Sequence, residues 1–143
     1  MASDSSAVLH STSRAPTPYS IAPWLSVRNG ARAIEFYKAA FGAVESHRLE
    51  DPTGAVLAKL TVNGAVVWVS GESPENYNST PELVGGDTVR LILIVSDPDA
   101  VFARALKAGA SQVFPVTEEH GWRLGRVVDP FGLHWEIGHE LSR

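Results

Sequence analysis

The first ordered part of the chain alternates apolar and polar side chains. In I-A-P-W-L-S-V-R-N, residues 21–29, Leu25 and Val27 fall on one face of an extended chain, and Trp24 and Ser26 fall on the other. A period of two residues is typical of a strand with one buried face. This stretch therefore predicts a half-buried strand.

The pattern then changes to a spacing of three and four residues, which predicts an amphipathic helix over residues 30–41. Its apolar positions are Ala33, Ile34, Tyr37, Ala40 and Phe41. Gly42 is suited to end this helix, because glycine tolerates the left-handed conformation common after a last turn. Three further strands are predicted at 44–50, 55–62 and 65–70, and the Asn63-Gly64 pair predicts a tight hairpin between the last two.

The second half repeats this order. A strand is predicted at 88–97, a helix from Asp97-Pro98 to Gly109, and strands at about 112–117, 122–128 and 133–138. An offset of 68 residues aligns the halves: Leu25 with Leu93, Val27 with Val95, Asn29 with Asp97, Gly64 with Gly132, and Val69 with Ile137. A repeated order of elements indicates duplication of one βαβββ unit.

The predicted fold class is α+β, with two tandem βαβββ units forming a curved mixed sheet around a cup and the helices outside. We expect a flexible N-terminal tail over residues 1–18, the first unit over 19–70, a polar linker over 71–87, and the second unit over 88–143. Together, residues 19–143 would form one domain. The alternative for the tail is an arm that packs on a partner subunit.

Composition narrows the classes of function. The chain of 143 residues has a formal net charge of −4 and no run of basic residues, which argues against a nucleic-acid partner. It has no cysteine, which excludes disulfides and thiolate chemistry and is compatible with a cytoplasmic location. No apolar stretch is long enough for a membrane span, and the N-terminus lacks the pattern of a signal peptide.

The duplicated chain contains two stretches that allow comparison with known families: L-S-V-R-N-G-A-R-A-I-E-F-Y-K-A-A-F-G-A and W-R-L-G-R-V-V-D-P-F-G-L-H-W-E-I. Over residues 20–140 it resembles the vicinal oxygen chelate superfamily of glyoxalases, bleomycin-resistance proteins and extradiol dioxygenases, and its PhnB-like branch most closely. The resemblance implies a small-molecule cup and a homodimer whose units can be exchanged between chains. It does not imply one function, because such folds host isomerases, dioxygenases, thiol transferases and drug-sequestering proteins.

The resemblance also implies where a metal would be held. The metal-ligand positions of the superfamily correspond to Ala22, Trp68, Arg90 and Glu136. Only Glu136 can ligate a metal, since Ala22 has no donor atom, Trp68 offers only an N–H group, and Arg90 is a cation. We therefore expect no metal cofactor. A minority alternative is a divalent metal held by His134 and Glu136, with His120 or His47 completing the set.

Strand alternation predicts which side chains line the cup. In the last strand Leu133, Trp135 and Ile137 should lie under the helices, whereas His134 and Glu136 should face the cup. The predicted ligand-binding residues are Trp24, Trp68, Arg90, Ile92, His134 and Glu136, and Ser26, Val66 and Ile94 lie on the same faces. Three of them have a structural alternative: Trp24 and Trp68 could be ordinary core, and His134 could form only a structural hydrogen bond.

Three functions fit this pattern. In the first, a metal-independent protein binds a partly apolar metabolite or antibiotic between aromatic walls, with Arg90 taking an anionic or carbonyl group. In the second, a lyase, isomerase or dioxygenase-like enzyme uses Glu136 or His134 as acid, base or metal ligand, although pairing with Arg90 would weaken Glu136 as a base. In the third, large side chains fill the cup and the domain is structural or regulatory. For Asp129-Pro130-Phe131-Gly132 we predict hairpin geometry alone.

Overall fold

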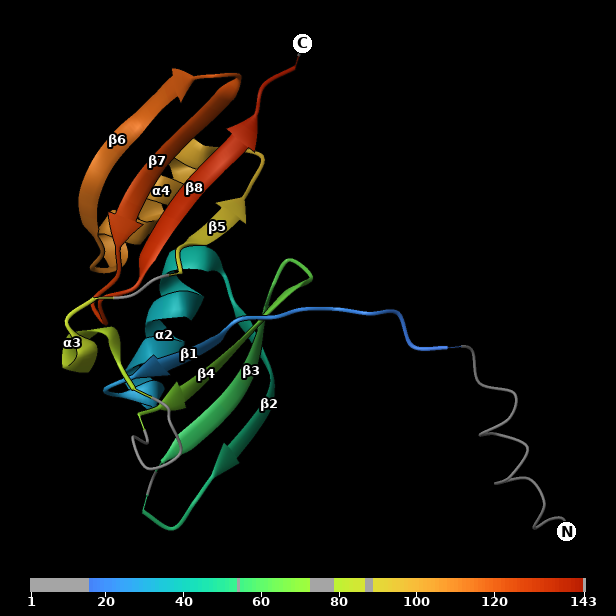
Figure 1. Ribbon diagram of the computed structural model, residues 1–143, viewed down its shortest axis with the longest axis vertical. Coiled ribbons are helices and arrows are strands. Elements are labelled where there is room, and N and C mark those ends of the chain that lie inside the picture. Colours follow the sequence, from blue (N-terminus) through green and yellow to red (C-terminus); the bar gives the residue numbers. More distant parts are fainter. Residues whose placement is uncertain (1–15, 54, 73–78, 87–88, 143) are drawn as a thin grey trace, which may run out of the picture.

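The computed structural model describes residues 16–53, 55–72, 79–86 and 89–142 (Figure 1). Most of the predicted tail and part of the predicted linker lie outside these residues. Within the described linker, Pro81–Val84 form a short helix, α3, that the polar composition of this segment did not predict. None of the described helices is long and apolar enough to cross a membrane.

Both halves of the chain fold as βαβββ units, which confirms the α+β fold class. The first unit comprises β1 (Trp24–Val27), α2 (Gly30–Phe41), β2 (Val44–Glu50), β3 (Val56–Val62) and β4 (Ala65–Gly71). The second comprises β5 (Leu91–Ile94), α4 (Pro98–Ala108), β6 (Ser111–Glu119), β7 (Trp122–Val128) and β8 (His134–Glu140). The eight strands form two four-stranded mixed sheets, with orders β1-β4-β3-β2 and β5-β8-β7-β6, and share no ladder among the described residues.

The repeat of 68 residues is visible in the strand register. Leu25 of β1 pairs with Val69 of β4, and the equivalent Leu93 of β5 pairs with Ile137 of β8, both in parallel ladders. The helix starts are equivalent too: Asn29 accepts a hydrogen bond from the backbone N–H of Arg32, as Asp97 does from that of Ala100. A side-chain acceptor at this position satisfies one of the free N–H groups of the first turn.

One face of each sheet is buried under its own helix. α2 packs on β1, β3 and β4, and α4 packs on β6, β7 and β8; Figure 1 shows α4 behind the sheet of the second unit. The predicted burial in the last strand is confirmed, since Leu133, Trp135 and Ile137 are all buried. The main core therefore lies between sheets and helices.

The two units contact each other through their helices and an aromatic cluster. α2 packs against α4, and Arg104 of α4 donates a hydrogen bond from Nε to the carbonyl oxygen of Ala39 near the end of α2 at 2.7 Å. Phe41 of α2 lies against Trp135 of β8, with ring centroids 4.8 Å apart. Because the helix sides of the units meet, the opposite faces of both sheets remain uncovered in the single chain.

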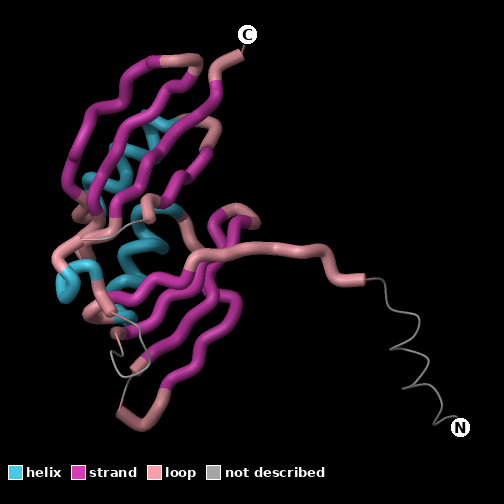
Figure 2. Tube along the Cα trace, viewed as in Figure 1, coloured by secondary structure: helices cyan, strands magenta, loops and turns pink. Residues whose placement is uncertain are grey.

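The chain enters the first sheet through an extended segment. Figure 2 shows residues 16–22 as a loop that runs away from both sheets before β1 begins. Tyr19 and Ile21 in this segment are fully exposed.

Candidate functional site

The uncovered face of the first sheet, here called the first open face, is built around two tryptophans. The rings of Trp24 and Trp68 stack with centroids 6.3 Å apart and an interplanar angle of 19°. Trp24 donates from Nε1 to Ser70 Oγ at 2.8 Å, which fixes the orientation of its indole. The ammonium group of Lys59 lies 5.7 Å from the centroid of the Trp68 ring. This face thus offers a stacking surface with a cation at its side.

The uncovered face of the second sheet, the second open face, carries aliphatic and charged side chains. Ile92 is 67% exposed and Ile94 is 52% exposed, although both lie in a strand. Next to them a hollow of about 140 Å³ is lined by Ile92, Ile94, Trp122, Leu124, Glu136 and Gly138. The structure therefore places the predicted site residues in two sets, with Trp24 and Trp68 on one sheet and Arg90, Ile92, His134 and Glu136 on the other.

Arg90 and Glu136 form an ion pair, with Nη2 of Arg90 3.6 Å from Oε1 of Glu136. Arg90 lies just before β5, and its side chain is 53% exposed, whereas that of Glu136 is 20% exposed. Solvent at the arginine screens the attraction, so the pair is a weak one.

Replacement of either partner should therefore have a small effect on stability. We expect Arg90→Met and Glu136→Gln each to lower the free energy of unfolding by less than about 1 kcal/mol, because exposed pairs contribute little. Urea denaturation of the two variants and of the double variant measures this effect. A loss of several kcal/mol from either single change would show that the pair is dry in the native protein.

His134 and a residue that sequence reasoning missed, Arg126, adjoin this pair. Arg126 of β7 lies directly opposite Glu136 in the ladder and donates from Nε to Nδ1 of His134 at 3.1 Å. The alternation in W-R-L-G-R-V-V puts Arg126 on the same face as Leu124, and this pattern could have revealed it. Among the described residues the other histidines lie elsewhere: His47 is exposed on β2, His139 is exposed and bonded to the Val95 carbonyl, and His120 takes a positive φ in the β6–β7 turn.

The side chains present do not fit a metal centre of the kind that the resemblance implies. Glu136 is the sole carboxylate at the implied positions, and Arg90 lies against it. Among the described residues no three His, Asp or Glu side chains gather closely enough to hold a metal ion. A protein metal site needs three or four converging nitrogen or oxygen ligands. We therefore derive no chemistry through a metal.

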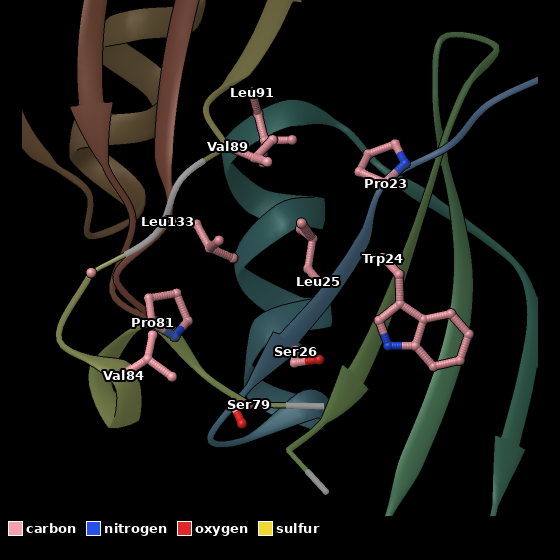
Figure 3. A pocket seen from close by; sticks show the side chains of 11 residues that line it. Pro23, Trp24, Leu25, Ser26, Ser79, Pro81, Val84, Val89, Leu91 and Leu133 are labelled. Atoms are coloured by element: carbon pink, nitrogen blue, oxygen red, sulfur yellow. The ribbon is translucent and has the colours of Figure 1, made fainter. Parts of the chain in front are cut away.

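A larger apolar pocket of about 470 Å³ lies where the two units meet (Figure 3). Its walls come from β1, α3, the start of β5 and the turn before β8, and Trp24 and Ser26 contribute to it from the first open face. Figure 3 shows Leu25, Leu91 and Leu133 around the same hollow. The pocket thus extends the apolar lining from the first open face toward the second unit.

A buried carboxylate, Asp129, lies on the helix side of the second sheet. Its Oδ1 accepts the backbone N–H groups of Phe131 and Leu133 at 2.9 and 3.0 Å, and its Oδ2 accepts the Tyr37 hydroxyl at 2.5 Å and the Trp135 indole N–H at 2.9 Å. The hairpin geometry predicted for this turn is present, with Gly132 at a φ of 89°. The additional bonds to Tyr37 and Trp135 were not predicted.

Burial governs the protonation of this network. It raises the pKa of Asp129, although hydrogen bonds from Tyr37, Trp135 and the backbone oppose the rise. Burial and the nearby Asp129 carboxylate raise the pKa of Tyr37 well above its usual range, so Tyr37 remains a hydrogen-bond donor. The network is closed to solvent and lies away from the open faces, so we assign it a structural role.

Comparison with known proteins agrees with this arrangement. The family model of the glyoxalase-like domain matches residues 24–137. An uncharacterised protein of Mycobacterium bovis is 41% identical over 126 residues, which cover 85% of this chain and 83% of the relative. The crystal structure of TioX from Micromonospora sp. ML1 is 30% identical, covers 86% of this chain and 100% of its own, and superposes with a TM-score of 0.67.

A glyoxalase/bleomycin resistance protein/dioxygenase family enzyme from Burkholderia phytofirmans shares the fold at 20% identity and a TM-score of 0.65, covering 82% of this chain and 95% of its own. Paired βαβββ units with uncovered sheet faces define the vicinal oxygen chelate class. The chain belongs to the glyoxalase-like domain family within it.

Proposed function

We propose that this protein binds a partly apolar small molecule, a metabolite or an antibiotic, without a metal, in a cup formed by the open faces of two copies. The observation that carries the proposal is the pair of open faces. One presents stacked indoles, and the other presents exposed isoleucines beside Arg90, Glu136 and His134. Ligand pockets typically combine apolar walls with a few converging polar groups. Assignment to the PhnB-like branch and a cytoplasmic location remain predictions.

The stacking surface should be the main source of affinity. We expect Trp68→Ala to weaken binding of an uncharged planar probe, 2-naphthamide, by about tenfold, because removal of a stacking partner and its contact area costs at least about 1.4 kcal/mol. Fluorescence titration measures the affinity. The control is Leu83→Ala, which removes an exposed apolar side chain of α3. Equal saturable binding by all three proteins would show that the probe occupies another surface.

Metal independence has a direct test. After purification without chelators, we expect metal analysis to find far less than one divalent ion per chain, because Glu136 is accompanied by a cation and not by further ligands. Native mass spectrometry of the same sample would show any retained organic ligand. A metal close to one per chain that is lost in Glu136→Gln would contradict the proposal and favour the enzyme alternative, with Glu136 or His134 at the reacting centre.

A second copy is proposed because both open faces carry large apolar side chains that the single chain leaves exposed. Trp24, Ile92 and Phe114 are each about half exposed or more, and they lie on faces that the helices of the same chain do not cover. Large apolar side chains left exposed on a sheet face indicate an interaction site. In a twofold dimer the first open face of one copy can cover the second open face of the other.

The dimer should dissociate when charge is placed on an open face. We expect light scattering to give about twice the chain mass of 15.4 kDa for the native protein and a single chain mass for Ile92→Glu. Leu83→Glu, on the exposed side of α3, is the matched control and should remain dimeric. A native protein that stays monomeric at high concentration would exclude the shared cup.

A further inference from the structure

Arg126 is held in place on the second open face by two neighbours. Its Nε donates to Nδ1 of His134 at 3.1 Å, and its guanidinium carbon lies 5.9 Å from the centroid of the Phe114 ring. One contact comes from β8 and the other from β6, so the strands on either side of β7 both orient the group. A guanidinium fixed in this way loses less rotamer entropy when it binds a ligand.

The bond to His134 determines which ring nitrogen carries the proton. A guanidinium group only donates hydrogen bonds, so Nδ1 of His134 must be the acceptor and carry no proton. The neutral imidazole then carries its proton on Nε2. His134 therefore offers an N–H donor from its other nitrogen.

Among the described residues, the positive charge of Arg126 is not balanced by a carboxylate bonded to it. Glu136, which lies opposite Arg126 in the ladder, makes its ion pair with Arg90 at 3.6 Å. Within the described part of the chain, the terminal nitrogens of Arg126 have no hydrogen-bond or ion-pair partner. Around Arg126 two arginines adjoin one carboxylate, because the other carboxylates of this face, Glu119 and Glu140, lie at its far end opposite Trp122. An excess of donors over acceptors is complementary to an anion.

We propose that Arg126 and His134 form a carboxylate-binding subsite and that the ligand of the cup is a planar aromatic carboxylate. The carboxylate accepts two parallel hydrogen bonds from the terminal nitrogens of Arg126, and Nε2–H of His134 supplies a third donor. The ring system lies over the adjoining hollow beside Ile92, Ile94 and Leu124. This inference rests on the proposed function and names the class of ligand that the cup takes.

The test compares two probes that differ in one group, 2-naphthoate and its uncharged amide, 2-naphthamide. Affinities are measured by titration for the native protein, for Arg126→Met, and for Arg123→Met as the control. Arg123 lies on the same strand but is bonded to Asp99 of α4, on the helix side of the sheet. Circular dichroism establishes that each variant is folded, and nitrogen-15 NMR of the imidazoles reports the His134 tautomer.

The native protein should bind 2-naphthoate at least tenfold more tightly than 2-naphthamide, and this preference should disappear in Arg126→Met and persist in Arg123→Met. The Nε2–H form of His134 should be the sole neutral form in the native protein, and the Nδ1–H form should become detectable in Arg126→Met. If both probes bind equally, or if Arg126→Met keeps the preference, the proposed carboxylate subsite is wrong. The proposed binding of apolar molecules in the cup is then not contradicted. If neither probe binds, both proposals fail.

Discussion

Replacing Asp129 by alanine should lower the free energy of unfolding by about 3–5 kcal/mol. The change removes the carboxylate that accepts four hydrogen bonds. The Tyr37 hydroxyl, the Trp135 indole N–H and two backbone N–H groups are then left without an acceptor. Each buried donor that loses its partner costs about 1–3 kcal/mol, and partial relaxation keeps the total below the sum. Urea denaturation followed by tryptophan fluorescence measures the loss.

The first unit offers a matched control, because Asp51-Pro52-Thr53-Gly54 has the same turn sequence pattern as Asp129-Pro130-Phe131-Gly132. Asp51 also accepts backbone N–H groups two and four residues later, but its turn is exposed. Asp51→Ala should therefore cost only about 1 kcal/mol, since water can replace the lost acceptor. Equal losses in the two variants would mean that the turn alone, and not the link to Tyr37 and Trp135, makes Asp129 important.

The contribution of Asp129 should also depend on pH. Burial raises its pKa in the folded chain above the ordinary value of about 3.9. Between the ordinary and the raised pKa the folded chain binds more protons than the unfolded chain, so the free energy of unfolding falls as the pH rises through this window. Asp129→Asn cannot titrate and lacks this fall. The difference in stability between the native protein and Asp129→Asn, measured across the window, should therefore decrease with rising pH.

Gly125→Ala should destabilise the second unit by about 1–3 kcal/mol. An added Cβ would lie 2.8 Å from Cε2 of Phe102 and 2.9 Å from Cγ2 of Val116, closer than carbon atoms approach in folded proteins. The space is taken by α4, which packs on β7 at this point, and overpacking of a core costs an amount of this size. Thermal and urea denaturation both report the change.

The control for this variant is Gly71→Ala at the end of β4. No heavy atom lies within 4 Å of a Cβ built on Gly71, and this glycine does not have a positive φ. Its replacement should leave the free energy of unfolding within about 0.5 kcal/mol of the native value. If Gly125→Ala is equally harmless, α4 can move away from the sheet without loss, and the close packing there does not stabilise the unit.

The fold could be predicted from the sequence where the hydrophobic pattern of a segment agreed with the 68-residue repeat. Alternation assigned Trp135 to the buried face and Glu136 to the open one, and the repeat placed Leu25 and Leu93 at equivalent positions in the two sheets. The division of the strands into two sheets could not be predicted from the hydrophobic pattern or the repeat. Periodicity tells which face of a strand is covered, but it does not tell which unit, or which copy, covers the other face.

The residues that were missed depend on partners remote in the sequence. The turn pattern accounts for the bonds of Asp129 to its own backbone, but its bond to Tyr37 joins residues 92 positions apart. Alternation could have placed Arg126 on the open face, but only the ladder shows that it lies opposite Glu136 and that it contacts His134. Strand pairing therefore shows which side chains meet on a face, which the strand's own sequence does not.

The bond between Tyr37 and Asp129 has a consequence for synthesis of the chain. During translation α2 leaves the ribosome long before Asp129, Phe131 and Trp135, which later cover its aromatic side. The first unit must therefore wait with Tyr37 and its neighbours in water or in transient contacts. Contacts of such long sequence separation slow folding, and exposed intermediates of this kind are prone to aggregate. A nascent chain that stalls between the two units should thus be a better client for chaperones than one that stalls after β8.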